Sequence, residues 1–268
     1  MRILVIGAGN MGLTYAEGMA KSPLLSRRNL MIFDVSTEKT QTLSKIPHFD
    51  VYDNIEECLP KSDLVFIAVK PFHSEDLFKK IKNLVNKEQI FISLMAGVTI
   101  KTIQDGLDIK KVIRTMPNLP AQVGKGVTSY TESPEVSRVE LLTVRNLLDT
   151  TGASIHVENE QFIDASTGIS GSGPAYIFYF MQSMLEAALK MGFSPNDSRI
   201  LVTNTFEGAV KLFNESDLSP ETWMDRVASK GGTTRAALDS MEDNNVKELI
   251  KEAAYAAFDR ATELGLQK

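Results

Sequence analysis

Three glycines near the start of the chain have the spacing of a phosphate-binding turn. Gly7, Gly9 and Gly12 directly follow the apolar run 3–6. In that order they permit a tight turn, let the backbone approach a pyrophosphate, and let the next helix pack closely on the strand. The N–H groups that open such a helix face the phosphates. The residues that we expect to bind a dinucleotide here are Ile6, Gly7, Ala8, Gly9, Asn10, Met11 and Gly12.

A carboxylate follows the second apolar run, at the distance that a dinucleotide site requires. The run 30–33 ends directly before Asp34, which comes roughly 20 residues after the glycine turn. Asp34 can accept a hydrogen bond from a ribose 2′-OH and would repel a 2′-phosphate. The hydroxyl groups of Ser36 and Thr37 are compatible with a cofactor that carries a 2′-phosphate. We therefore expect NADH or NADPH, with NADH favoured.

Three further segments follow predicted strands and are rich in glycine, proline or small residues. Ligands of open α/β sheets bind beyond the C-terminal ends of the strands. Any one of these segments alone is better explained as an ordinary connection between a strand and a helix. The three segments are Ala68-Val69-Lys70-Pro71, Ala96-Gly97-Val98-Thr99 and Met116-Pro117-Asn118-Leu119-Pro120-Ala121.

Two glycine turns with hydroxyl residues lie in the second half of the chain. The segment 170–173 precedes a long predicted helix, where a helix start can receive an anion or a nicotinamide. The segment 228–235 also precedes a helix, and its N–H groups suit a carboxylate. A closely packed helix entry and a capped loop are the corresponding alternatives.

The elements that must position these residues alternate between strand and helix in the first half. Alternation of this kind, with strands apolar throughout, indicates a parallel sheet covered by helices on both faces. The short runs 126–130 and 153–157 extend the sheet edge. The predicted strands are 2–6, 30–33, 64–69, 90–94 and 111–114, and the predicted helices are 11–21, 37–45, 74–85 and 99–107.

Only helix signals follow residue 158. Ser194-Pro195 and Ser219-Pro220 are helix starts, and a last helix is expected over 245–264. The apolar stripe of 174–191 is too wide for a solvent-facing helix, so we expect burial there or pairing with a second copy. The fold class is thus α/β, with a Rossmann-type domain over 1–158 and an all-helical substrate-binding and dimerisation domain over 159–268.

Composition excludes several classes of partner. The net charge of −5, without a stripe of Lys and Arg, argues against nucleic acid. No segment approaches the roughly 20 apolar residues of a membrane span. Cys58 is the single cysteine, which excludes an internal disulfide and favours a reducing compartment, so the cytoplasm is expected. No cluster of His, Cys and carboxylates has the spacing of metal ligands.

The chain resembles the pyrroline-5-carboxylate reductases along essentially its whole length. The most specific segments are SGSGPAY at 170–176 and the glycine–threonine turn of SKGGTT at 229–234. The GAGNMG at 7–12, AVKP at 68–71, AGVT at 96–99 and MPNLPA at 116–121 occur in the order of the family. The resemblance implies an NAD(P)H-dependent oxidoreductase that reduces 1-pyrroline-5-carboxylate to proline, the last step of proline biosynthesis.

The resemblance also implies where the ligands bind. The substrate carboxylate would meet N–H groups around Gly232 and Thr233, beside Ser229, and the hydroxyl of Thr234 would hydrogen-bond the ring nitrogen as the catalytic contact. It further implies a homodimer in which the partner's helical domain completes each site, and sometimes a ring of dimers. The cofactor would lie along the glycine turn, Ala68, Val69, Lys70, Pro71, Met95, Ala96 and Gly97.

Two departures from the family pattern keep other interpretations open. Leu119 stands where the family has a threonine (MPNTPA), and Lys230 stands where it has a proline (SPGGTT). A nucleotide-binding, reductase-like regulator or a reductase of a related cyclic imine are the alternatives. A dehydrogenase of 3-hydroxy acids is disfavoured, because its lysine acid/base would be matched only by Lys190, at the far end of the long helix.

Overall fold

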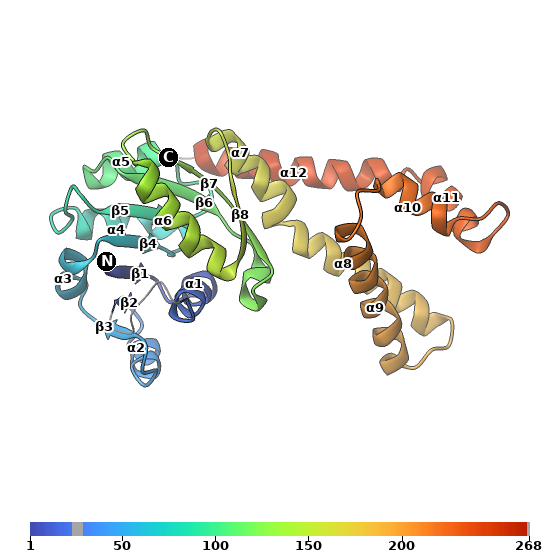
Figure 1. Ribbon diagram of the computed structural model, residues 1–268, viewed down its shortest axis with the longest axis horizontal. Helices are drawn as coiled ribbons and strands as arrows, with labels where there is room; N and C mark the ends of the chain where they lie inside the picture. The colour runs from blue at the N-terminus through green and yellow to red at the C-terminus, as the bar shows by residue number, and fades with distance from the viewer. Residues whose placement is uncertain (23–28, 267–268) are drawn as a thin grey trace. The chain divides into compact units, whose positions relative to one another are not determined.

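The computed structural model describes residues 1–22 and 29–266, and the chain packs as two compact units (Figure 1). One unit is Met1–Ser172 together with Ala256–Lys268, and the other is Gly173–Tyr255. The last helix, α12 (Val246–Leu266), contributes residues to both. Residues 159–172 thus pack with the first unit, whereas the sequence suggested a division after residue 158; that division remains a prediction.

The first unit is built on an eight-stranded sheet whose strand order is β3-β2-β1-β4-β5-β6-β7-β8. Strands β1 to β6 all run parallel. From β1 the strands are added toward one edge of the sheet, through β2 to β3, and from β4 onward they are added toward the other edge. That reversal is the switch point at which doubly wound folds bind nucleotides. The strands are β1 (Ile3–Ile6), β2 (Leu30–Phe33), β3 (Asp50–Tyr52), β4 (Leu64–Ile67), β5 (Ile90–Ser93), β6 (Val112–Met116), β7 (Gly126–Glu132) and β8 (Gly152–His156).

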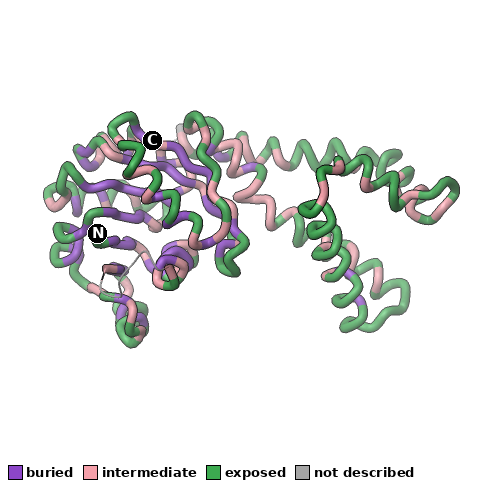
Figure 2. Tube along the Cα trace, in the orientation of Figure 1, coloured by how far each residue is buried: buried purple, intermediate pink, exposed green. Residues whose placement is uncertain are grey.

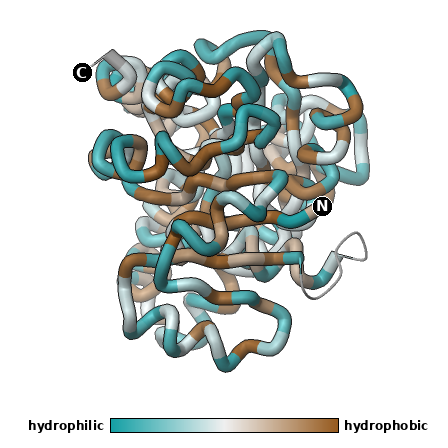
Figure 3. Tube along the Cα trace, turned by 90° about the vertical axis from the view of Figure 1, so that its left-hand side faces the viewer, coloured by the Kyte–Doolittle hydropathy of each residue, from teal (hydrophilic) through white to brown (hydrophobic). Residues whose placement is uncertain are grey.

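Two hydrophobic clusters, one on each face of the sheet, explain why the central strands are apolar throughout. Successive side chains of a strand point to opposite faces, so Ile3 joins one cluster and Leu4 the other. Helices α1 (Asn10–Ala20) and α6 (Arg138–Leu148) cover the first face. Helices α3 (Ile55–Cys58), α4 (Ser74–Ile81) and α5 (Ile100–Leu107) cover the second. The buried, apolar strands stand out in Figures 2 and 3.

The far edge of the sheet departs from the all-parallel arrangement. Strand β7 pairs antiparallel with β6, and β8 then pairs parallel with β7. Only the short 3-10 segment Leu119–Val123 lies between β6 and β7, and a parallel crossover needs a dozen or more residues. The expected extension of the sheet edge is confirmed, but the direction of these two strands is opposite to the rest.

Several elements of this unit escaped the sequence analysis. Strand β3 and helix α3 are too short for a periodic pattern to show. Helix α6 did carry a signal, because Ser137 and Glu140 form a capping box at its start. The remaining helices of this unit are α2 (Thr37–Leu43) and α7 (Glu160–Ser166), and α7 runs into a π-helical turn at Thr167–Gly171.

The second unit is helical throughout and has little core of its own. Its helices are α8 (Gly173–Lys190), α9 (Pro195–Asn214), α10 (Pro220–Val227), α11 (Thr233–Asp243) and the first half of α12. Ser194 and Ser219 cap α9 and α10 as predicted.

The expected burial of α8 is wrong for the single chain. None of the described residues of α8 is buried, and Phe178 and Tyr179 are 59% and 76% exposed. The green trace of this unit in Figure 2 shows the same pattern. The physical reason is that α8 packs mainly against α9 within the chain, which leaves most of its apolar circumference uncovered. An exposed apolar surface of this kind is typical of a protein interface.

The described residues contain neither a membrane-spanning helix nor a cluster of metal ligands. No helix is long and apolar enough to cross a membrane. No group of three or more His, Cys, Asp and Glu side chains has the arrangement needed to hold a metal ion.

Candidate functional site

The glycine turn lies between β1 and α1, at the switch point of the sheet. Gly7 has φ +99°, a conformation that other residues rarely adopt. A Cβ on Gly12 would lie 1.9 Å from the carbonyl oxygen of Gly7 and 2.9 Å from the Cβ of Ala68. Only glycine therefore lets α1 pack this closely on the turn, as the sequence spacing predicted.

Gly9 faces open space, in contrast to its neighbours. A Cβ on Gly9 would meet no other described heavy atom within 4 Å, apart from its chain neighbours. Gly9 is also the N-cap of α1, and no described side chain caps this helix. The first N–H groups of a helix need acceptors, and an uncapped start beside open space fits a phosphate group.

The loop after β4 is in direct contact with the glycine turn. A Cβ on Gly7 would lie 2.9 Å from the carbonyl oxygen of Ala68 and 3.3 Å from Cγ1 of Val69. Lys70 and Pro71 are exposed at the end of this loop. The structure thus brings together the two segments 7–12 and 68–71, which the sequence analysis assigned to one cofactor.

The next loop along the sheet follows β5. At Met95–Gly97 this loop offers a ligand its backbone rather than its side chains. Met95 is only 1% exposed, and its N–H donates to Oγ of Ser93 at 3.2 Å. Ala96 and Gly97 are half-buried, and Gly97 has φ +71°. Any contact of Met95 with a ligand would therefore be made by its main chain.

Asp34 is turned inward, toward the glycine turn. It is 7% exposed, and its Oδ2 accepts the N–H of Ala8 at 2.7 Å. Its Oδ1 accepts the N–H of Ser36 at 2.9 Å, and the Nζ of Lys39 lies 3.5 Å from Oδ2. A carboxylate has about four acceptor sites, so capacity for a ribose hydroxyl remains. Lys39 was missed by the sequence analysis, although a basic residue in the helix after Asp34 was visible there.

The predicted substrate residues lie in the second unit, at the start of α11. Gly232 is the N-cap of this helix, its φ and ψ are −83° and 169°, and it carries no side-chain cap. The N–H of Gly232 donates to the carbonyl of Ser229 at 3.0 Å, which closes the turn. Thr233 is exposed and Thr234 half-buried in the first turn. An uncapped helix start of this kind suits a carboxylate.

The other glycine–serine segment does not form the turn that was expected. The chain is helical across Thr167–Gly171, and Oγ of Ser170 donates to the carbonyl of Ser166 at 3.0 Å. A Cβ on Gly171 would lie 2.7 Å from Cε of Met116. This contact agrees with the close-packing interpretation, and Ser172 forms a bend between the π-helical turn and α8.

The two residues that depart from the family pattern are both at the surface. Leu119 is 45% exposed, next to the end of β6, and Lys230 is exposed in the turn before α11. Next to Lys230, Gly231 supplies the positive φ, +72°, of the turn.

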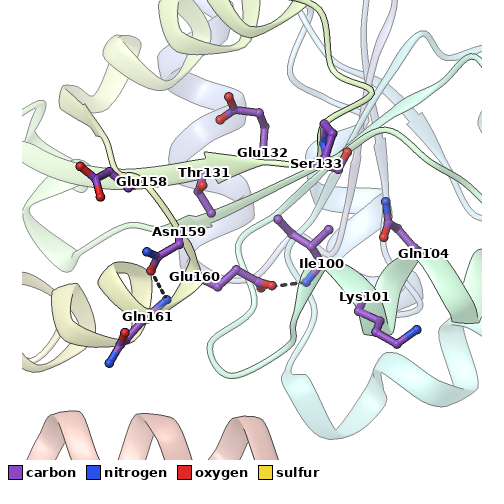
Figure 4. A pocket seen from close by; sticks show the side chains of 11 residues that line it. Ile100, Lys101, Gln104, Thr131, Glu132, Ser133, Glu158, Asn159, Glu160 and Gln161 are labelled. Atoms are coloured by element: carbon purple, nitrogen blue, oxygen red, sulfur yellow. Dashed lines mark hydrogen bonds between the residues drawn. The ribbon is translucent and has the colours of Figure 1, made fainter.

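A buried thiol and a surface hollow lie outside these segments. Cys58 is fully buried, and burial raises the pKa of its thiol to about 11, which makes it a poor nucleophile. A hollow of about 500 Å³ lies between the starts of α5 and α7 (Figure 4). None of the predicted site residues lines it, so it is not the site described above.

Comparison with known proteins places the chain in a family. Residues 160–264 match a family described as pyrroline-5-carboxylate reductase dimerisation, which indicates a homo-oligomer. Residues 2–97 match a family described as NADP oxidoreductase coenzyme F420-dependent, which indicates a nicotinamide cofactor.

Full-length relatives agree with both matches. The pyrroline-5-carboxylate reductase of Aquifex aeolicus is 32% identical over 98% of this chain and 97% of its own length. The solved pyrroline-5-carboxylate reductase of Coxiella burnetii has a TM-score of 0.90 at 29% identity, covering 98% of each chain. The Plasmodium falciparum pyrroline carboxylate reductase with NADP bound has a TM-score of 0.89 at 28% identity, over 99% of this chain and 98% of that one. The chain therefore belongs to the pyrroline-5-carboxylate reductase family.

Proposed function

We propose that this protein reduces 1-pyrroline-5-carboxylate to proline, with hydride taken from a reduced nicotinamide nucleotide. The observation that carries the proposal is the packing at the switch point. Gly7 and Gly12 allow the turn, α1 and Ala68 to approach one another in a way that any Cβ would prevent. The uncapped start of α1 then lies next to the open space at Gly9. Together with the family membership, this arrangement supports a dinucleotide site.

The residues of the first unit fit the cofactor. The N–H groups at the start of α1 are suited to the pyrophosphate, and the acceptor capacity of Asp34 is suited to the adenosine ribose. The loops at Ala68–Pro71 and Met95–Gly97 would line the nicotinamide half. The cofactor supplies the hydride when it is bound.

The turn before α11 would bind the substrate. In this proposal the carboxylate of the cyclic imine accepts hydrogen bonds from N–H groups at Gly232 and Thr233, with Ser229 closing the turn. The hydroxyl of Thr234, in the same first turn, would hydrogen-bond the ring nitrogen. Lys230 adds a cation near this carboxylate, which favours binding of the substrate.

The proposed reaction requires that the imine and the cofactor be positioned correctly, and it does not require a strong base. A protonated C=N bond is already a good hydride acceptor, so the protein has to hold the imine carbon in reach and to exclude water. Positioning of two reactants can supply several kcal/mol of the barrier, about 7–11 in well-oriented cases. This agrees with a site built from glycines, small hydroxyls and backbone N–H groups.

NADH is the proposed preference between the two nucleotides. The Asp34 carboxylate lies at the end of β2, where it would repel a 2′-phosphate. Lys39, 3.5 Å from Asp34, partly offsets that charge, so NADPH should also be accepted. The ratio of kcat/KM for the two nucleotides tests this, and a strong preference for NADPH would overturn it.

The proposed assembly is a homodimer through the second unit, with a ring of dimers as the larger form. The exposed apolar side chains of α8 support pairing, because a monomer would leave them in water. The proposed compartment is the cytoplasm, since Cys58 is free and buried, as expected where thiols stay reduced. Light scattering together with sedimentation would measure the mass.

The decisive experiment follows oxidation of NADH and NADPH with pyrroline-5-carboxylate. The native chain, Thr234→Ala and the matched control Thr234→Ser are compared. We expect turnover in the native chain, a fall of about 10²-fold in kcat/KM for the alanine variant, and partial recovery in the serine variant, which keeps the hydroxyl. NADH binding should be unchanged in all three, because none of the residues assigned to the cofactor is altered.

Other outcomes would favour the alternatives. Turnover that is equal in Thr234→Ala would retain the enzyme and remove the role of the hydroxyl. Bound NADH without turnover in the native chain would favour a nucleotide-binding regulator or a reductase of a related cyclic imine.

A further inference from the structure

The loop that follows β5 is held by two segments that lie far from it in the sequence. One is the last turn of α12, and the other is the first turn of α7. The chain leaves the first unit after α7 and re-enters it within α12. Both contacts lie within the first unit, so each can be described directly.

Gly97 allows the last turn of α12 to approach this loop, and Gly265 lies opposite it in van der Waals contact. A Cβ on Gly97 would lie 3.2 Å from Cβ of Leu264, 3.3 Å from its carbonyl carbon and 3.4 Å from the nitrogen of Gly265. From the other side, a Cβ on Gly265 would lie 3.4 Å from the carbonyl oxygen of Gly97. The backbone of the helix thus packs directly on the backbone of the loop. Ala261, one turn earlier, is 5% exposed and anchors the helix here.

The other end of the loop is held by a hydrogen bond to a carboxylate that is itself part of an ion pair. Oε1 of Glu160 accepts the N–H of Ile100, the first residue of α5, at 2.8 Å (Figure 4). The same oxygen accepts Nη1 of Arg114 at 3.0 Å, and Arg114 also pairs with Asp164. Arg114 is 1% exposed, and a buried charge of this kind is stable only with its partners in place. Glu160 is therefore held rigidly, and with it the junction between the loop and α5.

We propose that Gly265 and Glu160 are positioning residues, which hold the loop 95–99 so that its backbone can line the nicotinamide half of the cofactor. This inference rests on the proposed function, which assigns Met95–Gly97 to the nicotinamide. The proposal assigns neither residue to the cofactor itself; each acts through the loop. Because a displacement of about 1 Å at a reacting group can cost on the order of 10²-fold, the position of this loop matters for binding and turnover.

The proposal predicts different effects on the binding of the two halves of the nucleotide. The adenosine half depends on Asp34 and the glycine turn, which neither positioning residue contacts. A displaced loop should therefore weaken NADH, which carries a nicotinamide, and leave ADP unaffected, which does not. A purely structural defect would weaken both ligands, because both need a folded first unit.

The test compares Gly265→Val with Thr262→Val. Valine at 265 adds a Cβ 3.4 Å from the carbonyl oxygen of Gly97 and two further methyl groups on that Cβ, whereas Thr262 is exposed on the same helix and is nearly isosteric with valine. We expect Gly265→Val to raise the dissociation constant of NADH about tenfold or more, with that of ADP changed less than about twofold. Thr262→Val should bind both as the native chain does. Fluorescence of bound NADH and calorimetry of ADP give the two constants.

A second pair of variants tests the other contact. Glu160→Gln keeps an acceptor for the N–H of Ile100, whereas Glu160→Ala removes it and leaves Arg114 with one partner fewer. The loss of NADH affinity should be larger for alanine than for glutamine, with ADP again unchanged in any variant that remains folded by circular dichroism.

Several results would overturn the inference. Unchanged NADH affinity in Gly265→Val would do so, as would equal weakening of NADH and ADP. A native chain that binds NADH but does not reduce pyrroline-5-carboxylate would overturn the proposed activity alone. A native chain that binds no NADH would overturn both.

Discussion

Replacing Gly9 by alanine separates a dinucleotide site from a glycine turn with only a structural role. In the structure the new Cβ would enter open space, with no described atom beyond its chain neighbours within 4 Å. The backbone of Gly9 has φ −80°, which alanine adopts without strain. The fold therefore offers no reason for glycine at this position, and only a ligand that needs the space does.

The two expected effects differ in size. Alanine is a slightly poorer N-cap than glycine but reduces the freedom of the unfolded chain, so the free energy of unfolding should change by less than about 1 kcal/mol. A methyl group where a phosphate oxygen should hydrogen-bond costs about 1.5–3 kcal/mol, because the acceptor is charged. That corresponds to a rise of roughly 10- to 150-fold in the dissociation constant of NADH.

Gly12→Ala is the matched comparison. Its Cβ would lie 1.9 Å from the carbonyl oxygen of Gly7, so α1 has to move, and the fully buried Tyr15 and Met19 resist that movement. Overpacking of this kind costs about 1–3 kcal/mol or more, so this variant should lose thermal stability as well as binding. Thermal unfolding and NADH fluorescence are measured on both variants. Native affinity for NADH in Gly9→Ala would refute the reasoning.

Three further predictions use the same structure. Asp34→Asn keeps an acceptor for the N–H of Ala8 but removes the charge, so the ratio of kcat/KM for NADPH over NADH should rise about tenfold; an unchanged ratio would mean that this carboxylate does not select the nucleotide. The thiol of Cys58, with its pKa raised to about 11 by burial, should resist a disulfide reagent at pH 8 until the chain is unfolded; rapid reaction in the native state would contradict this. Burial opposes ionisation of Glu140, but hydrogen bonds from Ser137 and Lys111 outweigh it and hold the pKa of this carboxyl below its usual value. Its contribution to stability is thus present above the unfolded pKa of about 4.3 and is lost as the pH falls through the lower folded pKa, so urea unfolding of Glu140→Gln should show a smaller decline below about pH 5 than the native chain.

The sequence alone determined the class of the fold and the order of its main strands and helices. Short runs of apolar residues such as 64–67 are typical of strands buried on both faces, and they alternate with helices, which implies a doubly wound sheet. Signals that act over a few residues were equally informative: the serines before Pro195 and Pro220 cap their helices as predicted. The glycine spacing at 7–12 placed the turn where the structure has it, because the backbone at Gly7 and the close packing at Gly12 are local steric requirements that only glycine meets.

Only the tertiary structure decided which distant segments meet. The sequence offered no sign that the N–H of Ala8 binds the Asp34 carboxylate, or that Gly265 packs on Gly97, because contacts across many residues leave no periodic pattern. The same holds for the exposure of α8: a wide apolar stripe indicates that a helix needs covering, but not whether its own chain supplies the cover. Local sterics and periodicity depend on residues that are close in the sequence. The choice of distant partners depends on how the whole chain packs.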